Sequence, residues 1–470
     1  MVAIPHHQLS LSQPEIDDLF ASQKQFFASG VTRTLQFRQG MLATLKKAIQ
    51  RHEQDILAAL SKDLGNPAFE AYGKEVGLLY AEIDHTLKHL RSWMQPERVP
   101  TPLLFFPSKS VIYSDPLGVT LIIAPWNYPA MLSLSPLIAA IAGGNTSIVK
   151  LSEMATHTAV LLTKMLTECF EEQYIAVLNG PGHFLGEMLI ERHHLDHVFF
   201  TGSSTVGKKI LASAAKQLTP VTLELGGKSP CIVAADANLE HAAKKIVWSK
   251  TLNTGQTCVA PDYLLVHRSV KTQLVEKIKA ALVRQYGDNP AHSPDYGRII
   301  NAQRLDVLES YLTQGQVIFG GQVIKSELYM APTLLEGMAP DSPVMTEEIF
   351  GPLLPILVYD TLEEAEAWVQ RNPYPLALYV YTQSDETAKF FTERLQFGGG
   401  CINNSLVHLG NSNLPFGGVG SSGMGQYHGH EGFRTFTRRK SVQTTSTWFD
   451  LPLWYPPYKN NIRWLRKYFG

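Results

Sequence analysis

The stretch from residue 118 to residue 150, GVTLIIAPWNYPAMLSLSPLIAAIAGGNTSIVK, decides the fold. It holds no Asp, Glu, Lys or Arg before its last residue, yet Pro125, Pro129 and Pro136 interrupt it. A continuous helix across a membrane is not expected, because proline breaks helical hydrogen bonds and lipid leaves the freed groups unsatisfied. The stretch predicts a buried strand, a sharp loop, a buried helix and a second buried strand, which together form the repeating unit of a parallel sheet.

Short β-branched runs of the same kind recur along the chain and alternate with helical patterns. Each run predicts a buried strand followed by a loop or a helix. The runs are YIAVLNG at 174–180, HVFF at 197–200, VTLEL at 221–225, PCIVAA at 230–235, DYLLVHR at 262–268, PILVYD at 355–360 and LALYVYT at 376–382. They predict two successive α/β units, with a cleft where the two meet. From about Leu19 to Arg91, apolar residues at three- and four-residue spacing predict amphipathic helices.

The composition excludes several classes of protein. The 470 residues carry a formal net charge of −1 and no long run of one sign, which argues against a nucleic-acid-binding surface. Cys169, Cys231, Cys258 and Cys401 form no CxxC pair, so neither a zinc site nor a disulfide framework is indicated. The N-terminus lacks the basic start and apolar core of a signal peptide. We expect a protein of the reducing cytoplasm with no integral membrane segment.

The C-terminal segment, WFDLPLWYPPYKNNIRWLRKYFG at 448–470, mixes aromatic and basic side chains. A segment of this kind can bind a membrane surface. It can also pack on a partner subunit, and this is the interpretation that we favour.

Three motifs supply candidate catalytic groups. In NTGQTCVAPDY at 253–263, Cys258 stands among small and polar residues, which is typical of a reactive thiol and also of a half-buried loop thiol. In LELGGKSP at 223–230, Glu224 ends a predicted strand and could act as a general base, or it could be a solvated acid. In APWNYP at 124–129, two prolines pin the loop of Asn127, whose amide could donate to a developing oxyanion.

Three further motifs suit a nucleotide. FFTGSSTVGKKI at 199–210 turns into a helix between Gly202 and Gly207, where backbone N–H groups and the Ser203 hydroxyl could bind phosphate, although it is neither a GxGxxG fingerprint nor a P-loop. SIVKLSE at 147–153 places Lys150 and Glu153 at a strand end, within reach of a ribose. The last is EEIFGP at 347–352, in which Glu348 and Phe350 could hold a second ribose and a flat ring.

In this order, and together with the glycine-rich loop PFGGVGSSGMG at 415–425, the motifs resemble the successive signatures of the aldehyde dehydrogenase superfamily over nearly the whole chain. Cys258 follows Glu224 by 34 residues, as that family's nucleophile follows its base. The compact N-terminus and the tail YPPY at 455–458 resemble the class 3 and fatty-aldehyde branch, whose members are usually dimers.

The resemblance implies an α/β fold with a Rossmann-type cofactor domain, an α/β catalytic domain and a small β oligomerisation extension. The expected division assigns 1–99 and 117–225 to the NAD(P)-binding domain and 226–402 to the catalytic domain. Residues 100–116 and 403–470 are expected to form the bridging segments of a homodimer.

The resemblance also implies roles for individual residues. Cys258 would be the nucleophile, Glu224 the base and Asn127 an oxyanion donor. The cofactor, NAD or NADP, would be bound by Trp126, Lys150, Glu153, Gly202, Ser203, Gly207, Leu225, Gly226, Glu348 and Phe350. A glutamate at 153 favours NAD, because it accepts from a 2′-hydroxyl and repels a 2′-phosphate. Leu151 stands where the family pattern usually has proline. This departure concerns the local backbone, and through it the preference between NAD and NADP.

The leading hypothesis is NAD(P)-dependent oxidation of a medium- or long-chain aliphatic or an aromatic aldehyde to the carboxylic acid, through a thiohemiacetal and a thioester on Cys258. One alternative is a CoA-acylating dehydrogenase of the same fold, although such enzymes generally lack the glutamate base. Another is a cysteine hydrolase that pairs Cys258 with a distant histidine. His428 and His430, two apart in YHGHEGF, lack a third ligand, so no metal is expected.

Overall fold

The computed structural model describes residues 12–180, 182, 186–450 and 454–469. The first eleven residues, on which the expectation of no export signal rests, lie outside the described residues. The chain divides into two compact units, one made of Met1–Trp93 and Pro116–Thr437 and the other of Met94–Asp115 and Arg438–Gly470. The predicted division into cofactor, catalytic and bridging segments is finer than this, and it stays a prediction.

The larger unit contains a six-stranded sheet with the strand order β17-β7-β6-β3-β4-β5. The strands are β3 (Val119–Ile123), β4 (Thr146–Lys150), β5 (Ile175–Leu178), β6 (His197–Thr201), β7 (Val221–Glu224) and β17 (Gly423–Met424). All pairs are parallel except β17 with β7. The prediction for 118–150 is confirmed, because β3 and β4 flank helix α6 (Met131–Gly143), every residue of which is buried.

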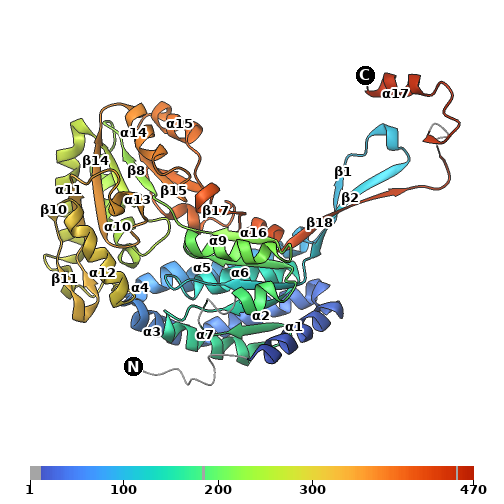
Figure 1. Cartoon of the computed structure of the whole chain (residues 1–470), viewed down its shortest axis with the longest axis horizontal. Helices are drawn as coiled ribbons and strands as arrows, with labels where there is room; N and C mark the ends of the chain where they lie inside the picture. Colours follow the sequence, from blue (N-terminus) through green and yellow to red (C-terminus); the bar gives the residue numbers. More distant parts are fainter. Residues whose placement is uncertain (1–11, 181, 183–185, 451–453, 470) are drawn as a thin grey trace. The chain divides into compact units, whose positions relative to one another are not determined.

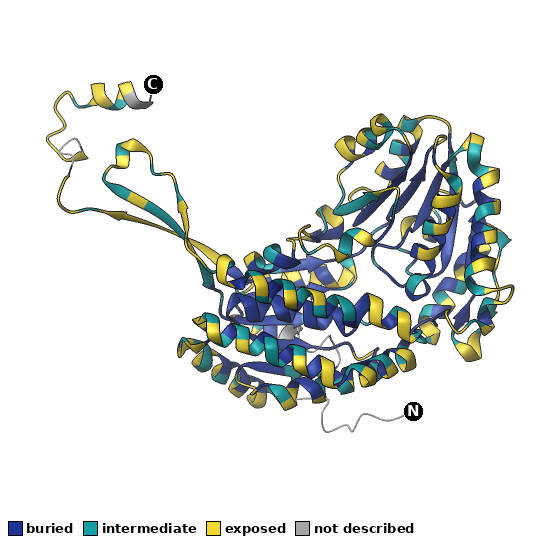
Figure 2. Ribbon diagram, turned by 180° about the vertical axis from the view of Figure 1, so that it is seen from behind, coloured by how far each residue is buried: buried dark blue, intermediate teal, exposed yellow. Residues whose placement is uncertain are grey.

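Helices cover this sheet. They are α1 (Gln13–Ala28), α2 (Leu35–Arg51), α3 (Glu53–Leu64), α4 (Ala68–Ala71), α5 (Gly77–Trp93), α7 (Thr156–Cys169), α9 (Ser204–Ala215) and α16 (Gly429–Thr435). Figure 1 labels helices α5, α6, α7 and α9 of the same unit. Strands β4 and β6 are buried along their whole length, as expected for a parallel sheet with both faces covered. The helices turn their apolar stripes towards the strands, so Figure 2 shows dark blue strands and yellow outer helix faces. The helices predicted from about Leu19 to Arg91 are confirmed.

Besides the two-stranded sheet of β11 (Val323–Ile324) and β12 (Tyr329–Met330), the larger unit contains a seven-stranded sheet with the order β10-β13-β14-β9-β8-β15-β16. Its strands are β8 (Pro230–Val233), β9 (Tyr263–His267), β10 (Gln316–Phe319), β13 (Thr333–Glu336), β14 (Leu353–Tyr359), β15 (Ala377–Tyr381) and β16 (Gly399–Ile402). Around it lie α10 (Leu239–Thr251), α11 (Lys271–Tyr286), α12 (Ala302–Tyr311), α13 (Pro343–Thr346), α14 (Leu362–Gln370) and α15 (Asp385–Arg394). Its core is a cluster of buried Leu, Ile, Val and Tyr side chains.

The smaller unit is built on a three-stranded sheet with the order β1-β2-β18. It consists of β1 (Glu97–Val99), β2 (Ser108–Pro116) and β18 (Thr437–Thr445), followed by helix α17 (Ile462–Phe469). Strand β18 is exposed from its second residue to its last. Among the helices of the described ranges, none combines the length and the apolar character needed to cross a bilayer.

Candidate active site

The candidate residues of the six-stranded sheet gather at one edge because its parallel strands all end there. Ile123 pairs in register with Lys150 and with Phe200, and Thr201 pairs with Glu224. The loop of Asn127 follows β3, Lys150 ends β4, the Gly202 turn follows β6 and Glu224 ends β7. The carboxyl edge of a parallel sheet is where such folds bind ligands.

The loop that carries Cys258 begins where helix α10 ends at Thr251. Asn253 and Thr254 adopt left-handed backbone conformations with φ of 53° and 54°. At Gly255, φ is 74° and a Cβ would lie 2.3 Å from the carbonyl oxygen of Gly351, so only glycine fits. This turn reverses the chain and leaves the half-buried thiol of Cys258 facing a cavity.

The cavity has a volume of about 710 Å³. Its apolar lining includes Leu78, Met131, Leu132, Trp248, Phe416 and Tyr427. Polar groups are fewer, and the buried ones at its wall include Lys74 and His428. This volume and lining fit a small, mainly apolar organic molecule.

Two acids lie near the thiol, and burial raises the pKa of all three groups. Burial raises the pKa of Cys258 to about 12, and the carboxyl groups of Glu348 and Glu224 add to the rise. The pKa of Glu224 lies well above its usual value because the side chain is buried. The thiol is therefore protonated near neutral pH, and nucleophilic attack requires a group that removes its proton.

Neither carboxyl oxygen of Glu224 has a hydrogen-bond partner among the described residues, and Oε1 of Glu348 has none either. Burial raises the pKa of Glu348 to about 8. This carboxyl packs on the backbone of Gly226, where a Cβ would lie 1.9 Å from Oε2. Buried acids without partners are typical of sites that handle protons or bind a polar ligand.

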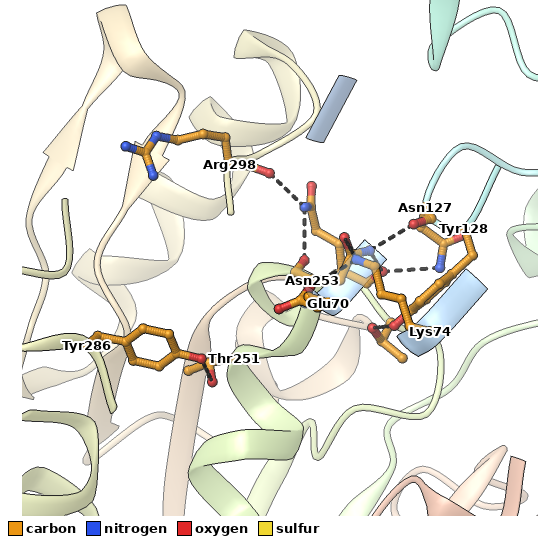
Figure 3. A network of polar contacts seen from close by, with 10 residues as sticks. Glu70, Lys74, Asn127, Tyr128, Thr251, Asn253, Tyr286 and Arg298 are labelled. Atoms are coloured by element: carbon orange, nitrogen blue, oxygen red, sulfur yellow. Dashed lines mark hydrogen bonds and ion pairs between the residues drawn. The ribbon is translucent and has the colours of Figure 1, made fainter. Parts of the chain in front are cut away.

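Asn127 is 3 % exposed, and its Nδ2 donates to the carbonyl oxygen of Gln256 at 3.1 Å. A side-chain amide has two N–H donors, so the second remains for a ligand. The neighbouring Tyr128 hydroxyl is 2.5 Å from Oγ1 of Thr257. These contacts join the Asn127 loop to the Cys258 loop (Figure 3).

The nucleotide candidates form two groups at the same sheet edge. In the first, Lys150 forms an ion pair with Glu153, whose Oε1 accepts from the Gly182 N–H at 3.3 Å. Burial alone would raise the pKa of Glu153, but the hydrogen bonds from Lys150 and Gly182 hold it below its usual value. The carboxylate therefore stays ionised and able to accept from a hydroxyl.

The second group lies where β6 turns into α9. Ser203 caps the helix by accepting from the Val206 N–H at 3.4 Å. A Cβ at Gly202 would lie 2.5 Å from the Phe200 ring, and one at Gly207 would lie 2.7 Å from a methyl group of Leu225, so a side chain at either position would displace its neighbour. The N-terminus of this helix suits a phosphate group.

Trp126 and Phe350 lie together, with ring centroids 5.2 Å apart in an edge-to-face arrangement. Phe350 has a φ of 48°, which is uncommon for a bulky residue and fixes the direction of its ring. Leu225 donates its N–H to the carbonyl oxygen of Ser422 at 3.0 Å, which ties the Glu224 strand end to the glycine-rich loop.

The two histidines considered as a metal pair have separate surroundings. His428 stacks on Phe416 with a centroid distance of 5.3 Å, whereas His430 stacks on Trp93 at 5.3 Å. Over the ranges that the structure describes, no three His, Cys, Asp or Glu side chains gather as a metal site requires. Cys231 is fully buried in β8, and all four cysteines are free thiols.

The sequence analysis missed several residues that support the site, namely Glu70, Lys74, Glu75 and Asn253. Glu70 and Lys74 are four apart in a helical stretch, a spacing that normally indicates an exposed ion pair. Their side chains are instead 12 % and 5 % exposed. The available signal was the apolar sequence VGLLY at 76–80, which directly follows Lys74 and Glu75 and predicts burial of this turn.

Comparisons with known proteins find matches over nearly the whole chain. The sequence model described as the aldehyde dehydrogenase family matches residues 8–442. The chain is 45 % identical to the 4,4′-diaponeurosporen-aldehyde dehydrogenase of Staphylococcus aureus, over 97 % of this chain and 99 % of that protein. It is 42 % identical to the dimeric NADP-preferring aldehyde dehydrogenase of Rattus norvegicus, over 92 % of this chain and 95 % of that one.

Solved structures share the fold. The substrate-bound state of Staphylococcus aureus AldH superposes with a TM-score of 0.94 at 45 % identity, covering 97 % of this chain and 99 % of that one. The structure of PnpE in complex with nicotinamide adenine dinucleotide has a TM-score of 0.84 at 27 % identity, covering 94 % of this chain and 92 % of that one.

Proposed function

The chain belongs to the aldehyde dehydrogenase family and catalyses NAD(P)-dependent aldehyde oxidation, and from this premise we propose the roles of its site residues. Cys258 is the nucleophile, Glu224 the base and Asn127 an oxyanion donor. The observation that carries the proposal is the thiol of Cys258 at the wall of an apolar cavity, with the unpartnered carboxyl of Glu224 in electrostatic reach.

In the first step the sulfur of Cys258 attacks the aldehyde carbon, and the thiol proton passes to the Glu224 carboxylate, directly or through water. The carbonyl oxygen becomes an oxyanion, which the free N–H of the Asn127 amide and the backbone N–H of Cys258 stabilise. Each such donor contributes about 2.7–4 kcal/mol in well-studied sites. The product is a tetrahedral thiohemiacetal.

When bound, NAD(P) would supply the hydride acceptor, and loss of hydride would leave a thioester on Cys258. Glu224 releases the thiol proton to solvent, then takes a proton from a water molecule, whose oxygen attacks the thioester carbon, and returns this proton to the sulfur. The carboxylic acid leaves, and the sulfur of Cys258 recovers its proton. The high pKa of the buried Glu224 suits this role, because the side chain holds the proton firmly once it has accepted it.

The described residues fit the cofactor. We assign the adenosine ribose to Lys150 and Glu153 and the pyrophosphate to the turn of Gly202, Ser203 and Gly207. The nicotinamide end is assigned to Trp126, Leu225, Gly226, Glu348 and Phe350. The unpartnered oxygen of Glu348 and the lack of room for a Cβ at Gly226 support this assignment. Glu153 favours NAD, and Lys150 also admits NADP.

We propose that the substrates are medium- or long-chain aliphatic or aromatic aldehydes. The support is the apolar wall of the 710 Å³ cavity, whose volume lies within the range of small-molecule sites. The name of the Staphylococcus aureus relative, a 4,4′-diaponeurosporen-aldehyde dehydrogenase, points in the same direction.

We also propose a cytoplasmic homodimer. The smaller unit exposes apolar side chains, including Leu103, Phe106 and Trp454, which a partner subunit could cover. A relative is named dimeric. Four free thiols are typical of a reducing compartment. Light scattering on the purified protein would test the dimer.

The activity test is absorbance of reduced nicotinamide with aldehydes of increasing chain length and aromatic aldehydes, with NAD and with NADP in parallel. We expect kcat/KM to rise with apolar chain length and free acid to form without any added thiol. Product that appears only when coenzyme A is added would favour the acylating alternative. Acyl transfer without nicotinamide reduction would favour the cysteine hydrolase.

A further inference from the structure

Two adjacent charged residues of one unusual turn reach the two loops that carry the candidate catalytic groups. The turn Tyr72–Val76 is a π-helix between α4 and α5. It contributes Lys74 and Glu75, and both side chains are buried. π-Helical turns are rare, and those that occur often lie at functional sites. The inserted residue changes which side chains of the helix face inward.

Lys74 contacts the Cys258 loop. Its Nζ donates to Oδ1 of Asn253 at 2.7 Å and to Oε1 of Glu70 at 3.0 Å, and it lies 5.1 Å from the centre of the Tyr128 ring. The same oxygen of Glu70 accepts from the backbone N–H of Asn253 at 2.8 Å. Side chain and backbone of Asn253 are thus both held, which fixes the left-handed turn at this residue (Figure 3).

Asn253 passes this constraint to the oxyanion donor. Its Nδ2 donates to the carbonyl oxygen of Asn127 at 2.8 Å and to that of Gln256 at 3.0 Å. The Gln256 carbonyl also accepts from the side chain of Asn127. The backbone and the amide group of Asn127 are therefore both oriented by groups that Asn253 positions.

Glu75 holds the other end of the Asn127 loop. Its Oε2 accepts from the backbone N–H groups of Ala130 at 2.8 Å and Met131 at 3.0 Å, at the start of α6. One turn of helix thus anchors the Asn127 loop at its end and the Cys258 loop near its beginning.

We propose that Lys74 is a positioning residue for aldehyde oxidation, which acts through Asn253 to aim the free N–H of Asn127 at the aldehyde oxygen. The inference rests on the proposed roles of Cys258 and Asn127. A structural role alone explains the geometry less well, because a buried ion pair adds little stability compared with apolar side chains of similar size. The ammonium group of Lys74 fixes the direction of the Asn253 amide, which an apolar side chain would not do.

The test compares two reactions of Cys258. Attack on an aldehyde creates an oxyanion, whereas alkylation by iodoacetamide displaces iodide from a saturated carbon and creates none. In Lys74→Met, and in Glu70→Gln/Lys74→Met, which also removes the charge of Glu70, we expect kcat/KM for the aldehyde to fall about ten- to a hundredfold. Alkylation of Cys258, followed by mass spectrometry of its peptide, should stay within about twofold of the wild type.

Two controls make the result specific. Lys164→Met removes another lysine paired with a glutamate four residues away, but this one is exposed, and it should leave both reactions unchanged. In an Asn127→Ala background, Lys74→Met should lower kcat/KM by less than about twofold, because the donor that Lys74 orients is already absent.

Three results would overturn the inference: unchanged kcat/KM in both Lys74 variants, an equal loss of oxidation and alkylation, or an undiminished loss in the Asn127→Ala background. If Lys74→Met does not fold, the double variant and Asn253→Ala carry the same expectation. A fully active Cys258→Ser would instead contradict the proposed function, so the two failures are distinguishable.

Discussion

The two sides of the Cys258 loop differ in how their buried polar groups are satisfied. On the supporting side, Lys74 and Asn253 form several hydrogen bonds at 2.7–3.0 Å. On the reacting side, Glu224 and Glu348 keep carboxyl oxygens without a partner among the described residues. Lys74 and Asn253 hold geometry through these hydrogen bonds, whereas Glu224 and Glu348 keep acceptor atoms for a proton, a water molecule or a ligand. On the supporting side, Oε1 of Glu75 also lacks a partner among the described residues.

The difference has an energetic meaning. An unpartnered buried polar atom costs about 1–3 kcal/mol, which a protein tolerates mainly at functional sites. The supporting side contains strained backbone at Asn253 and Thr254, which persists only where the surroundings over-determine it. The following predictions test this contrast.

The largest effect is expected on the reacting side, from Cys258→Ser. A serine hydroxyl is a far weaker nucleophile than a thiolate, so kcat/KM for aldehyde oxidation should fall by about 10³-fold or more. Steady-state absorbance of reduced nicotinamide measures it. Cys169→Ser, at the end of α7, is the matched control and should retain activity. Full activity of Cys258→Ser would contradict the assignment of Cys258 as the nucleophile.

Glu224→Gln should separate the two halves of the reaction. Without the base, the thioester hydrolyses slowly, and we expect about a 10²- to 10⁴-fold lower steady-state rate. If other groups can take up the thiol proton, rapid mixing should show one equivalent of reduced nicotinamide per subunit before turnover slows. Hydroxylamine cleaves thioesters without a base and should restore turnover. Wild-type turnover in Glu224→Gln, without hydroxylamine, would show that another group activates water.

Glu348→Gln tests whether an unpartnered acid affects stability. The pKa of Glu348 is raised to about 8, so between its usual value and pH 8 the folded state binds more protons than the unfolded one. The wild type should therefore lose stability as the pH rises from about 5 to 8. The variant should lose less, by about 3–4 kcal/mol, when urea unfolding is measured at pH 5 and at pH 8. Glu347→Gln, next to it and exposed, should keep the wild-type slope; equal slopes in all three proteins would contradict the prediction.

The smallest effect concerns the cofactor. Glu153→Gln removes a charge that repels a 2′-phosphate and leaves Lys150 in place, so the ratio of kcat/KM with NADP to that with NAD should rise about tenfold. Initial rates with both cofactors at a fixed aldehyde concentration measure the ratio. The exposed Glu172→Gln should not change it. An unchanged ratio in Glu153→Gln would contradict the assignment of this carboxylate to the adenosine ribose.

The sequence predicted the reacting side better than the supporting side. Cys258, Glu224 and Asn127 lie in short motifs with unusual neighbours. Asn127 follows and Glu224 ends a short, largely apolar strand, so pattern and chemistry indicated the same places. The strands predicted around 119–123, 146–150 and 221–224 are confirmed.

Lys74 was not predicted because a lysine four residues after a glutamate resembles a solvated pair. Its burial depends on a π-helical turn and on a partner 179 residues away, Asn253, which no local pattern indicates. The edge-to-face contact between Trp126 and Phe350 also joins distant segments, and only the folded chain shows it.

The short strand β17 has a consequence for how the protein is made. Gly423 pairs with Glu224, so the sheet that carries the base is completed by residues about 200 positions later in the chain. At translation rates of about 5–20 residues per second, the ribosome needs roughly 10–40 s to produce that partner. During this interval the nascent chain already contains Cys258 but presents β7 as an open edge, which makes it a substrate for chaperones before it is an enzyme.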